Sequence, residues 1–91
     1  MTDADILKMT KYNLAIAGTT WNEYLTDLIS AAKSMIEKEG IILDVNNTED
    51  CNLIVMYASY LYRKRAEDNP PMPRMLRYAL NNRVISAKAG G

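Results

Sequence analysis

The residue types most often used for catalysis and metal binding are scarce in this chain. Histidine, the usual general base and the commonest metal ligand, is absent from the 91 residues. Cys51 is the one cysteine, and without an imidazole to activate it a structural thiol is favoured over a nucleophile. No glycine-rich phosphate loop occurs. We therefore expect no enzymatic activity, and no cofactor or metal.

Three short motifs have a chemical interpretation that is weaker than a structural one. The segment 44–50, DVNNTED, resembles a calcium loop, but it lacks the glycine at the sixth position and Val55 replaces the bidentate glutamate. Asn46 begins a glycosylation pattern that is explained more simply as part of a helix cap. Pro70 and Pro73 form a PxxP pair, which indicates a helix-breaking linker before it indicates a peptide ligand.

Charge is balanced in total but divided along the chain. Eleven basic residues match eleven acidic ones, so the net charge points neither to nucleic acid nor to a membrane. Residues 1–50 carry a balance of −5 and residues 51–91 a balance of +5. The two halves can pair within one chain, or head to tail between copies. The single cysteine fits a reducing compartment, and the acidic N-terminus has no apolar core of a signal peptide.

The run from Asn52 to Arg65, NLIVMYASYLYRKR, is expected to form the central element. Between Leu53 and Tyr62 only Ser59 has neither an aliphatic nor an aromatic side chain, so apolar groups surround the helix. Such a helix must be covered on every face, and the run is too short to cross a bilayer, which needs about 20 apolar residues. Either the other helices enclose it or part of its surface meets another molecule. The functional prediction depends on the second alternative, in which sister copies supply the missing cover.

Spacing and capping signals predict an all-α fold, a small bundle of about four helices over residues 3–13, 21–39, 49–66 and 73–82. Thr20 and Glu23 have the spacing of a capping box at the second helix, and Gly40 supplies the left-handed residue that ends it. Residues 46–48 offer an N-cap for the third helix, and Pro73 can occupy the first position of the fourth. We expect residues 1–83 to form one domain and residues 84–91 a flexible tail.

Apolar stripes predict which helix faces are buried. On the second helix the stripe runs from Trp21 and Tyr24 to Met35 and Ile36 at steps of three and four. On the fourth helix one face carries Met72, Met75, Leu76, Ala79 and Leu80, and another carries Arg74, Arg77 and Asn81. The connector 41–45 is apolar and β-branched, but no second strand is available to pair with it, so we expect an extended segment that covers the core.

The predicted interface to another subunit or partner combines aromatic and basic side chains: Met56, Tyr57, Tyr60, Arg63, Lys64, Arg65, Arg74 and Arg77. Tyrosine is enriched at protein interfaces, although these tyrosines can also pack in the core with their hydroxyls at its edge. The basic residues have three alternatives: a solvated surface, contact with nucleic-acid phosphates, or contact with the acidic half of a neighbouring copy.

The order of these parts resembles the phage head–tail connector (adaptor, DNA-packaging) family. The resemblance covers about residues 3–83. It rests chiefly on LISAAKSMIEK in the second helix, on LIVMYASYLYRKR ahead of a proline-containing loop, and on the final helix PRMLRYALNNR. These motifs are packing patterns and contain no catalytic chemistry.

The resemblance implies an all-helical adaptor of phage or prophage origin that forms a homo-oligomeric ring below the portal protein. Such a ring extends the channel, through which DNA passes without sequence-specific contacts, and docks the next head-completion or tail protein. It implies a place in the virion, with assembly in the host bacterial cytoplasm and no membrane partner. The alternative hypothesis is a small helical DNA-binding or regulatory protein.

Overall fold

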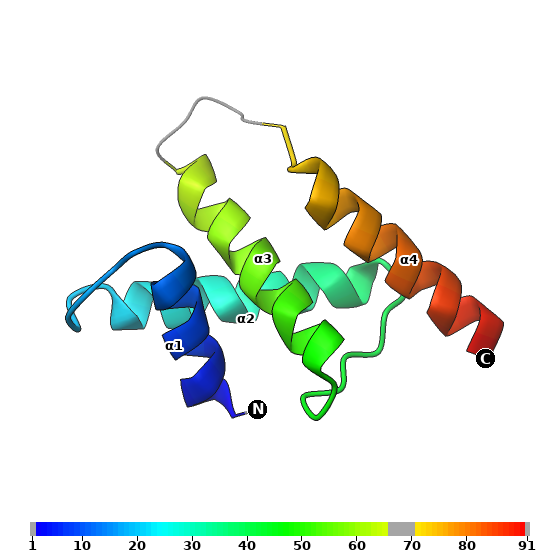
Figure 1. Cartoon of the computed structure of the whole chain (residues 1–91), viewed down its shortest axis with the longest axis horizontal. Coiled ribbons are helices and arrows are strands. Elements are labelled where there is room, and N and C mark those ends of the chain that lie inside the picture. The colour runs from blue at the N-terminus through cyan, green and yellow to red at the C-terminus, as the bar shows by residue number, and fades with distance from the viewer. Residues whose placement is uncertain (1, 66–70, 91) are drawn as a thin grey trace.

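The computed structural model describes residues 2–65 and 71–90 and contains four α-helices, with no strand among those residues (Figure 1). The helices are α1 (Asp3–Asn13), α2 (Asn22–Lys38), α3 (Thr48–Lys64) and α4 (Arg74–Gly90). The predicted all-α fold and the number of helices are therefore confirmed. None of the helices in the described part of the chain is long and apolar enough to span a membrane.

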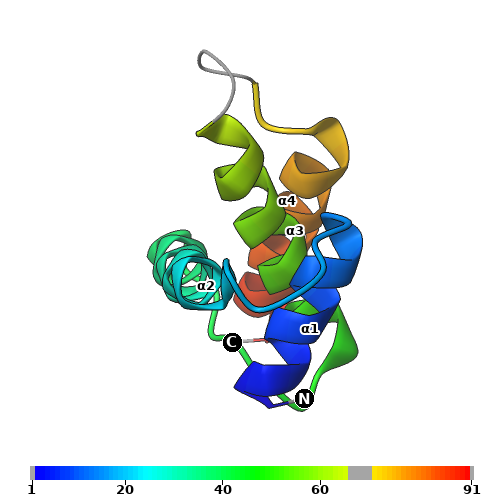
Figure 2. The ribbon, with the colours of Figure 1, turned by 90° about the vertical axis from the view of Figure 1, so that its left-hand side faces the viewer.

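The helices are arranged in two layers. Figure 2 shows α2 lying alone on one side, while α1, α3 and α4 lie on the other. α3 is central, because it packs against each of the other three helices. Its buried side chains join those of the other helices in one core, which includes Ile6, Ile29, Ile36, Ile54 and Leu80.

The beginning of α1 has a capping box that we did not predict. The Thr2 hydroxyl accepts a hydrogen bond from the Asp5 amide, and the Asp5 carboxylate accepts one from the Thr2 amide. The capping box predicted for the second helix is wrong. α2 begins after Trp21, which makes no side-chain capping bond, so Thr20 lies one residue too early to serve as the cap.

The other residues predicted to begin or end a helix lie at, or next to, the helix ends of the structure. Gly40 follows α2 with φ +96°, and Ile41 after it is buried in the core. Asn47 caps α3 by accepting a hydrogen bond of 2.9 Å from the Glu49 amide. Pro73 lies just before α4, and its carbonyl accepts a hydrogen bond from the Arg77 amide. Residue 66, the predicted last residue of the third helix, lies outside the described residues.

α4 continues to Gly90, past the predicted end at residue 82. Val84 packs against the core beyond the predicted end, and the following Ser-Ala-Lys-Ala sequence contains no helix breaker. The flexibility expected of residues 84–91 stays a prediction, as does the division into a domain and a tail.

As predicted, the connector between α2 and α3 forms no strand: residues 41–44 have no regular secondary structure and residues 45–46 form a turn. Its side chains alternate: Ile41 is buried, whereas Ile42 is 85% exposed. The Cys51 thiol is buried beneath the connector and donates a hydrogen bond to the Val45 carbonyl, which agrees with a structural thiol.

Candidate subunit interface

The central helix α3 is largely enclosed by the chain's own helices. Its buried residues include Leu53, Ile54, Val55, Tyr57, Ala58 and Ser59. Ser59 among them is polar, and its hydroxyl accepts a 2.8 Å hydrogen bond from the Asn13 side chain of α1. The helices α1, α2 and α4 therefore cover most of the run 53–62, and the incompletely covered part is limited to Met56, Tyr60, Leu61 and Tyr62. That sister copies cover this remaining part stays a prediction. The end of the helix beyond this run, from Arg63 to Arg65, is exposed.

Met56 and Tyr60 lie one turn apart on this incompletely covered side of α3. Met56 borders a groove of about 530 Å³ between α1 and α3, whose apolar lining comes from Met9, Tyr12, Val55 and Met56 itself. Tyr12 is 89% exposed, so an aromatic ring stands almost free beside the groove. The structure thus places one predicted interface residue at a concave apolar surface.

A second groove, of about 430 Å³, lies on the other side of Met56, between α3 and α4. Its lining is more polar and includes Glu49, Asp50 and Arg83. Met56 and Asn52 line both grooves, so they form a ridge between them.

Tyr57 belongs to the core and offers no surface to a partner, which corrects its predicted interface role. It is 5% exposed, and its ring meets that of Tyr60 edge to face at 6.1 Å. Burial raises the pKa of the Tyr57 phenol above its ordinary value, and the nearby Glu39 carboxylate adds to the effect. Residues 57 and 60 are three apart and so lie on neighbouring positions of the helix surface, yet Tyr57 is buried in the core and Tyr60 is only partly buried against it.

The basic residues predicted for the interface separate into different environments. Arg63 and Arg74 are exposed, near the end of α3 and in the first turn of α4. Lys64 has its Nζ atom 5.9 Å from the Tyr60 ring centre. Arg77 forms an ion pair with Glu39 at 3.7 Å, which ties α4 to the end of α2. The basic residues predicted for the interface therefore do not converge on one site.

Arg65 lies over a cluster of aromatic rings. Its guanidinium carbon is 4.7 Å from the ring centre of Trp21, 5.4 Å from that of Tyr24 and 5.3 Å from that of Tyr62. Trp21 and Tyr24, which the apolar stripe of the second helix placed against the core, are 37% and 36% exposed. Both rings lie against that of Tyr62, near the end of α3, with ring centres 6.1 Å (Trp21) and 6.5 Å (Tyr24) away.

An exposed apolar stripe on α4 was not predicted. Leu76 and Leu80 face the core as expected, but Met75 is 77% exposed, Tyr78 59% and Ile85 64%. Positions 75, 78 and 85 are separated by three and seven residues and so share one helix face, the face opposite Leu76 and Leu80. The prediction that Met75 faces the core is wrong, and the spacing to Tyr78 and Ile85 was the signal that could have revealed the stripe.

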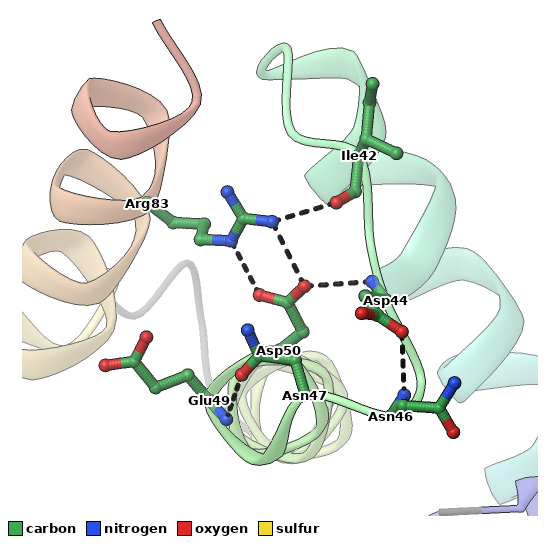
Figure 3. A network of polar contacts seen from close by, with 7 residues as sticks. All are labelled: Ile42, Asp44, Asn46, Asn47, Glu49, Asp50 and Arg83. Carbon is green, nitrogen blue, oxygen red and sulfur yellow. Dashed lines mark hydrogen bonds and ion pairs between the residues drawn. The ribbon is translucent and has the colours of Figure 1, made fainter. Parts of the chain in front are cut away.

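An ion pair between a buried aspartate, Asp50, and a partly buried arginine, Arg83, joins α4 to α3 (Figure 3). Arg83 donates from Nε to Asp50 Oδ1 at 2.7 Å and from Nη2 to Asp50 Oδ2 at 3.2 Å and to the Ile42 carbonyl at 2.9 Å. The Asp44 amide donates to the same carboxylate at 2.9 Å. Burial by itself would raise the pKa of Asp50, but the hydrogen bonds from Arg83 and Asp44 outweigh it and lower that pKa. The network joins α4, the connector and the first turn of α3.

Within the described residues, no group of three or more Cys, Asp and Glu side chains could hold a metal ion. Comparison with protein-family models gives no match, and comparison with curated proteins and with solved structures gives no significant one.

Proposed function

We propose that the protein is a structural subunit that assembles with further copies of itself, as a phage or prophage head–tail connector does. Support for a non-enzymatic role comes from the lack of histidine and from the buried position of Cys51. Support for the connector role comes from the resemblance of residues 3–83 in helix order and packing pattern.

The observation that carries the proposal is a pair of dissimilar apolar surfaces. One is the α4 stripe of Met75, Tyr78 and Ile85, which projects into solvent. The other is the α1/α3 groove, defined by Met9, Tyr12, Val55 and Met56. Figure 1 places α1 and α4 on opposite sides of α3.

In the proposed contact, the stripe of one copy packs into the groove of the next. A contact between two different surfaces is heterologous, so each added copy presents a free stripe or a free groove to another. Assembly then continues until the rotation between neighbours closes a ring. The ring would lie below a portal protein, let DNA through its channel without reading its sequence, and dock a head-completion or tail protein.

The test compares two surface variants with a control by size-exclusion chromatography coupled to light scattering. Wild type is expected to form oligomers whose population rises with concentration. Tyr78→Glu in the stripe and Tyr12→Glu in the groove each place a charge at the contact and should leave monomers. Ser34→Glu, on an exposed position of α2, should assemble like wild type.

Mixing the two variants separates a heterologous contact from a symmetric one. Each variant keeps one working surface, so an equal mixture of Tyr78→Glu and Tyr12→Glu should form a heterodimer and nothing larger. A wild type that remains monomeric at the highest attainable concentration contradicts the proposal, as does a mixture that contains only monomers.

A second candidate is a small helical DNA-binding or regulatory protein. It is favoured by one observation: the end of α3, with Arg63, and the beginning of α4, with Arg74, lie toward the same end of the molecule (Figure 1). Duplex binding through these residues would weaken steeply as salt is raised, and Arg63→Glu with Arg74→Glu would abolish it. Absence of duplex binding at low salt would eliminate this candidate.

A further inference from the structure

Three aromatic side chains meet where α2 begins and α3 ends. The ring centres of Trp21 and Tyr24 are 6.0 Å apart, those of Trp21 and Tyr62 are 6.1 Å apart, and those of Tyr24 and Tyr62 are 6.5 Å apart. Each ring therefore contacts both of the others. We call this set, Trp21, Tyr24 and Tyr62, the aromatic cage.

The cage holds a cation from its own chain. The guanidinium of Arg65 is within 5.4 Å of all three ring centres. This distance is inside the range of about 6 Å over which the negative face of an aromatic ring attracts a cation. No acidic side chain among the residues that the structure describes forms an ion pair with Arg65, so the rings are its principal partners.

The position of Trp21 is not explained by helix formation. It is the N-cap residue of α2, where Ser, Thr, Asp or Asn is preferred, and it makes no capping hydrogen bond. Nor is its ring hidden, since Trp21 is 37% exposed and Tyr24 36%. Trp21 thus neither caps its helix nor enters the core, and its ring lies against a cation. Sets of aromatic rings around a cation are used by proteins to recognise quaternary ammonium ligands.

We propose that the aromatic cage is a binding site for an organic cation, a guanidinium or a quaternary ammonium group, and that Arg65 fills it when no ligand is bound. Arg65 is an exposed residue at the end of its helix, so its side chain can leave without opening the core. A ligand must compete with Arg65, and its apparent affinity is lowered by the fraction of molecules in which Arg65 occupies the cage. The inference is independent of the proposed self-association, which uses α4 and the α1/α3 groove.

The chain contains its own probe, because Trp21 is the single tryptophan. Trp21 fluorescence is followed while tetramethylammonium chloride is added at constant ionic strength, with sodium chloride as the compensating salt. The titration is carried out on wild type, Arg65→Ser and Arg63→Ser. The last variant removes an equally exposed arginine near the same helix end and is the matched control.

The expected result is a saturable fluorescence change whose midpoint is at least about tenfold lower for Arg65→Ser than for wild type, since the internal competitor has been removed. Arg63→Ser should behave like wild type. Neohexanol, an uncharged molecule of similar shape, should give no saturable change, because the attraction requires a positive charge. Adding Tyr24→Leu to Arg65→Ser removes one wall of the cage and should abolish the response.

A second arm identifies the source of the cation. A short peptide with one central arginine, and the same peptide with trimethyllysine there, are titrated into Arg65→Ser. Binding of a peptide but not of tetramethylammonium assigns the cage to a protein side chain, and the reverse assigns it to a small quaternary amine.

Equal midpoints for wild type and Arg65→Ser, or a response to neohexanol as large as that to tetramethylammonium, would overturn the proposal. The proposal would also be overturned if Arg65→Ser kept the wild-type circular dichroism spectrum but gave no saturable response to tetramethylammonium or to either peptide. The rings and Arg65 would then serve only to hold the end of α3 against the beginning of α2. Monomer size in the self-association experiment has no bearing on these outcomes.

Discussion

Asp50 is the residue that connects the most distant parts of the chain. Its carboxylate is fully buried and accepts hydrogen bonds from Arg83 on α4 and from the Asp44 amide in the connector. A buried charge is tolerated only when it is paired and hydrogen-bonded. The position of α4 relative to α3 therefore depends on this pair, and so does the direction in which the α4 stripe points.

Removal of Arg83 should be costly because it leaves the Asp50 carboxylate buried without its cation. We expect Arg83→Ala to lower the free energy of unfolding by about 3 kcal/mol, measured by urea denaturation. Arg77→Ala is the matched control on the same helix. Its ion pair with Glu39 is 3.7 Å long and partly exposed, so the loss should be no more than about 1 kcal/mol. Equal losses of unfolding free energy for Arg83→Ala and Arg77→Ala would contradict the prediction that the pair of Arg83 with Asp50 contributes more to stability.

The lowered pKa of Asp50 predicts how stability depends on pH. Because the pKa is lower in the folded state than in the unfolded state, the ionised carboxylate stabilises the fold fully above the unfolded value of about 3.9. That contribution is lost as the pH falls through the lower folded value. Asp50→Asn should therefore be less stable than wild type at pH 7, and the difference should shrink progressively below about pH 4.

The measurement is urea denaturation of both proteins between pH 2 and pH 7. Asp3→Asn is the control, because Asp3 is an exposed acid whose pKa is also lowered, through a surface ion pair with Lys33. The difference in the free energy of unfolding between Asp3→Asn and wild type should be small at every pH. A difference between wild type and Asp50→Asn that does not change with pH would contradict the prediction.

At the scale of the helices, a threonine lies at the beginning of both α1 and α2, but only the one at α1 is an N-cap. Thr2 caps α1 together with Asp5, whereas Thr20 precedes the actual N-cap of α2. The same residue type is thus stabilising at one helix and unused as a cap at the other.

Alanine substitution should reveal this contrast. Thr2→Ala removes the hydroxyl that satisfies the Asp5 amide and should lower the free energy of unfolding by about 1 kcal/mol. Thr20→Ala should change it by less than about 0.5 kcal/mol, since no capping bond is lost. Thermal unfolding followed by circular dichroism measures both. A larger loss for Thr20→Ala than for Thr2→Ala would restore the capping box that the sequence suggested.

At the scale of the whole molecule, the basic half of the chain (residues 51–91) and the acidic half (residues 1–50) form ion pairs with each other. Two of the ion pairs in the described residues, Arg83 with Asp50 and Arg77 with Glu39, join the basic half to the acidic half. The surfaces proposed for self-association are instead apolar. Salt screens exposed charges but does not weaken apolar contacts.

We therefore expect self-association to persist or strengthen when sodium chloride is raised from 50 to 500 mM, as measured by sedimentation velocity. Duplex binding, in contrast, would fall by orders of magnitude over the same range. One variable thus separates the two candidate functions. Oligomers that dissociate as salt is raised would place charged residues at the contact and argue against the α4 stripe.

The sequence by itself determined the elements of this protein. Short-range signals such as Gly40 after α2 and Asn47 before α3 act between neighbouring residues, so they could be recognised without the fold. Tertiary structure alone decided which faces are covered. Asp50 and Arg83 are 33 residues apart, and neither charge indicates that the other is its buried partner. The exposed position of Met75, the enclosure of Tyr57 and the meeting of Arg65 with Trp21 likewise follow from how α2 and α4 cross α3. Helical periodicity assigns side chains to faces, but only the packing of distant helices determines which apolar face finds a partner.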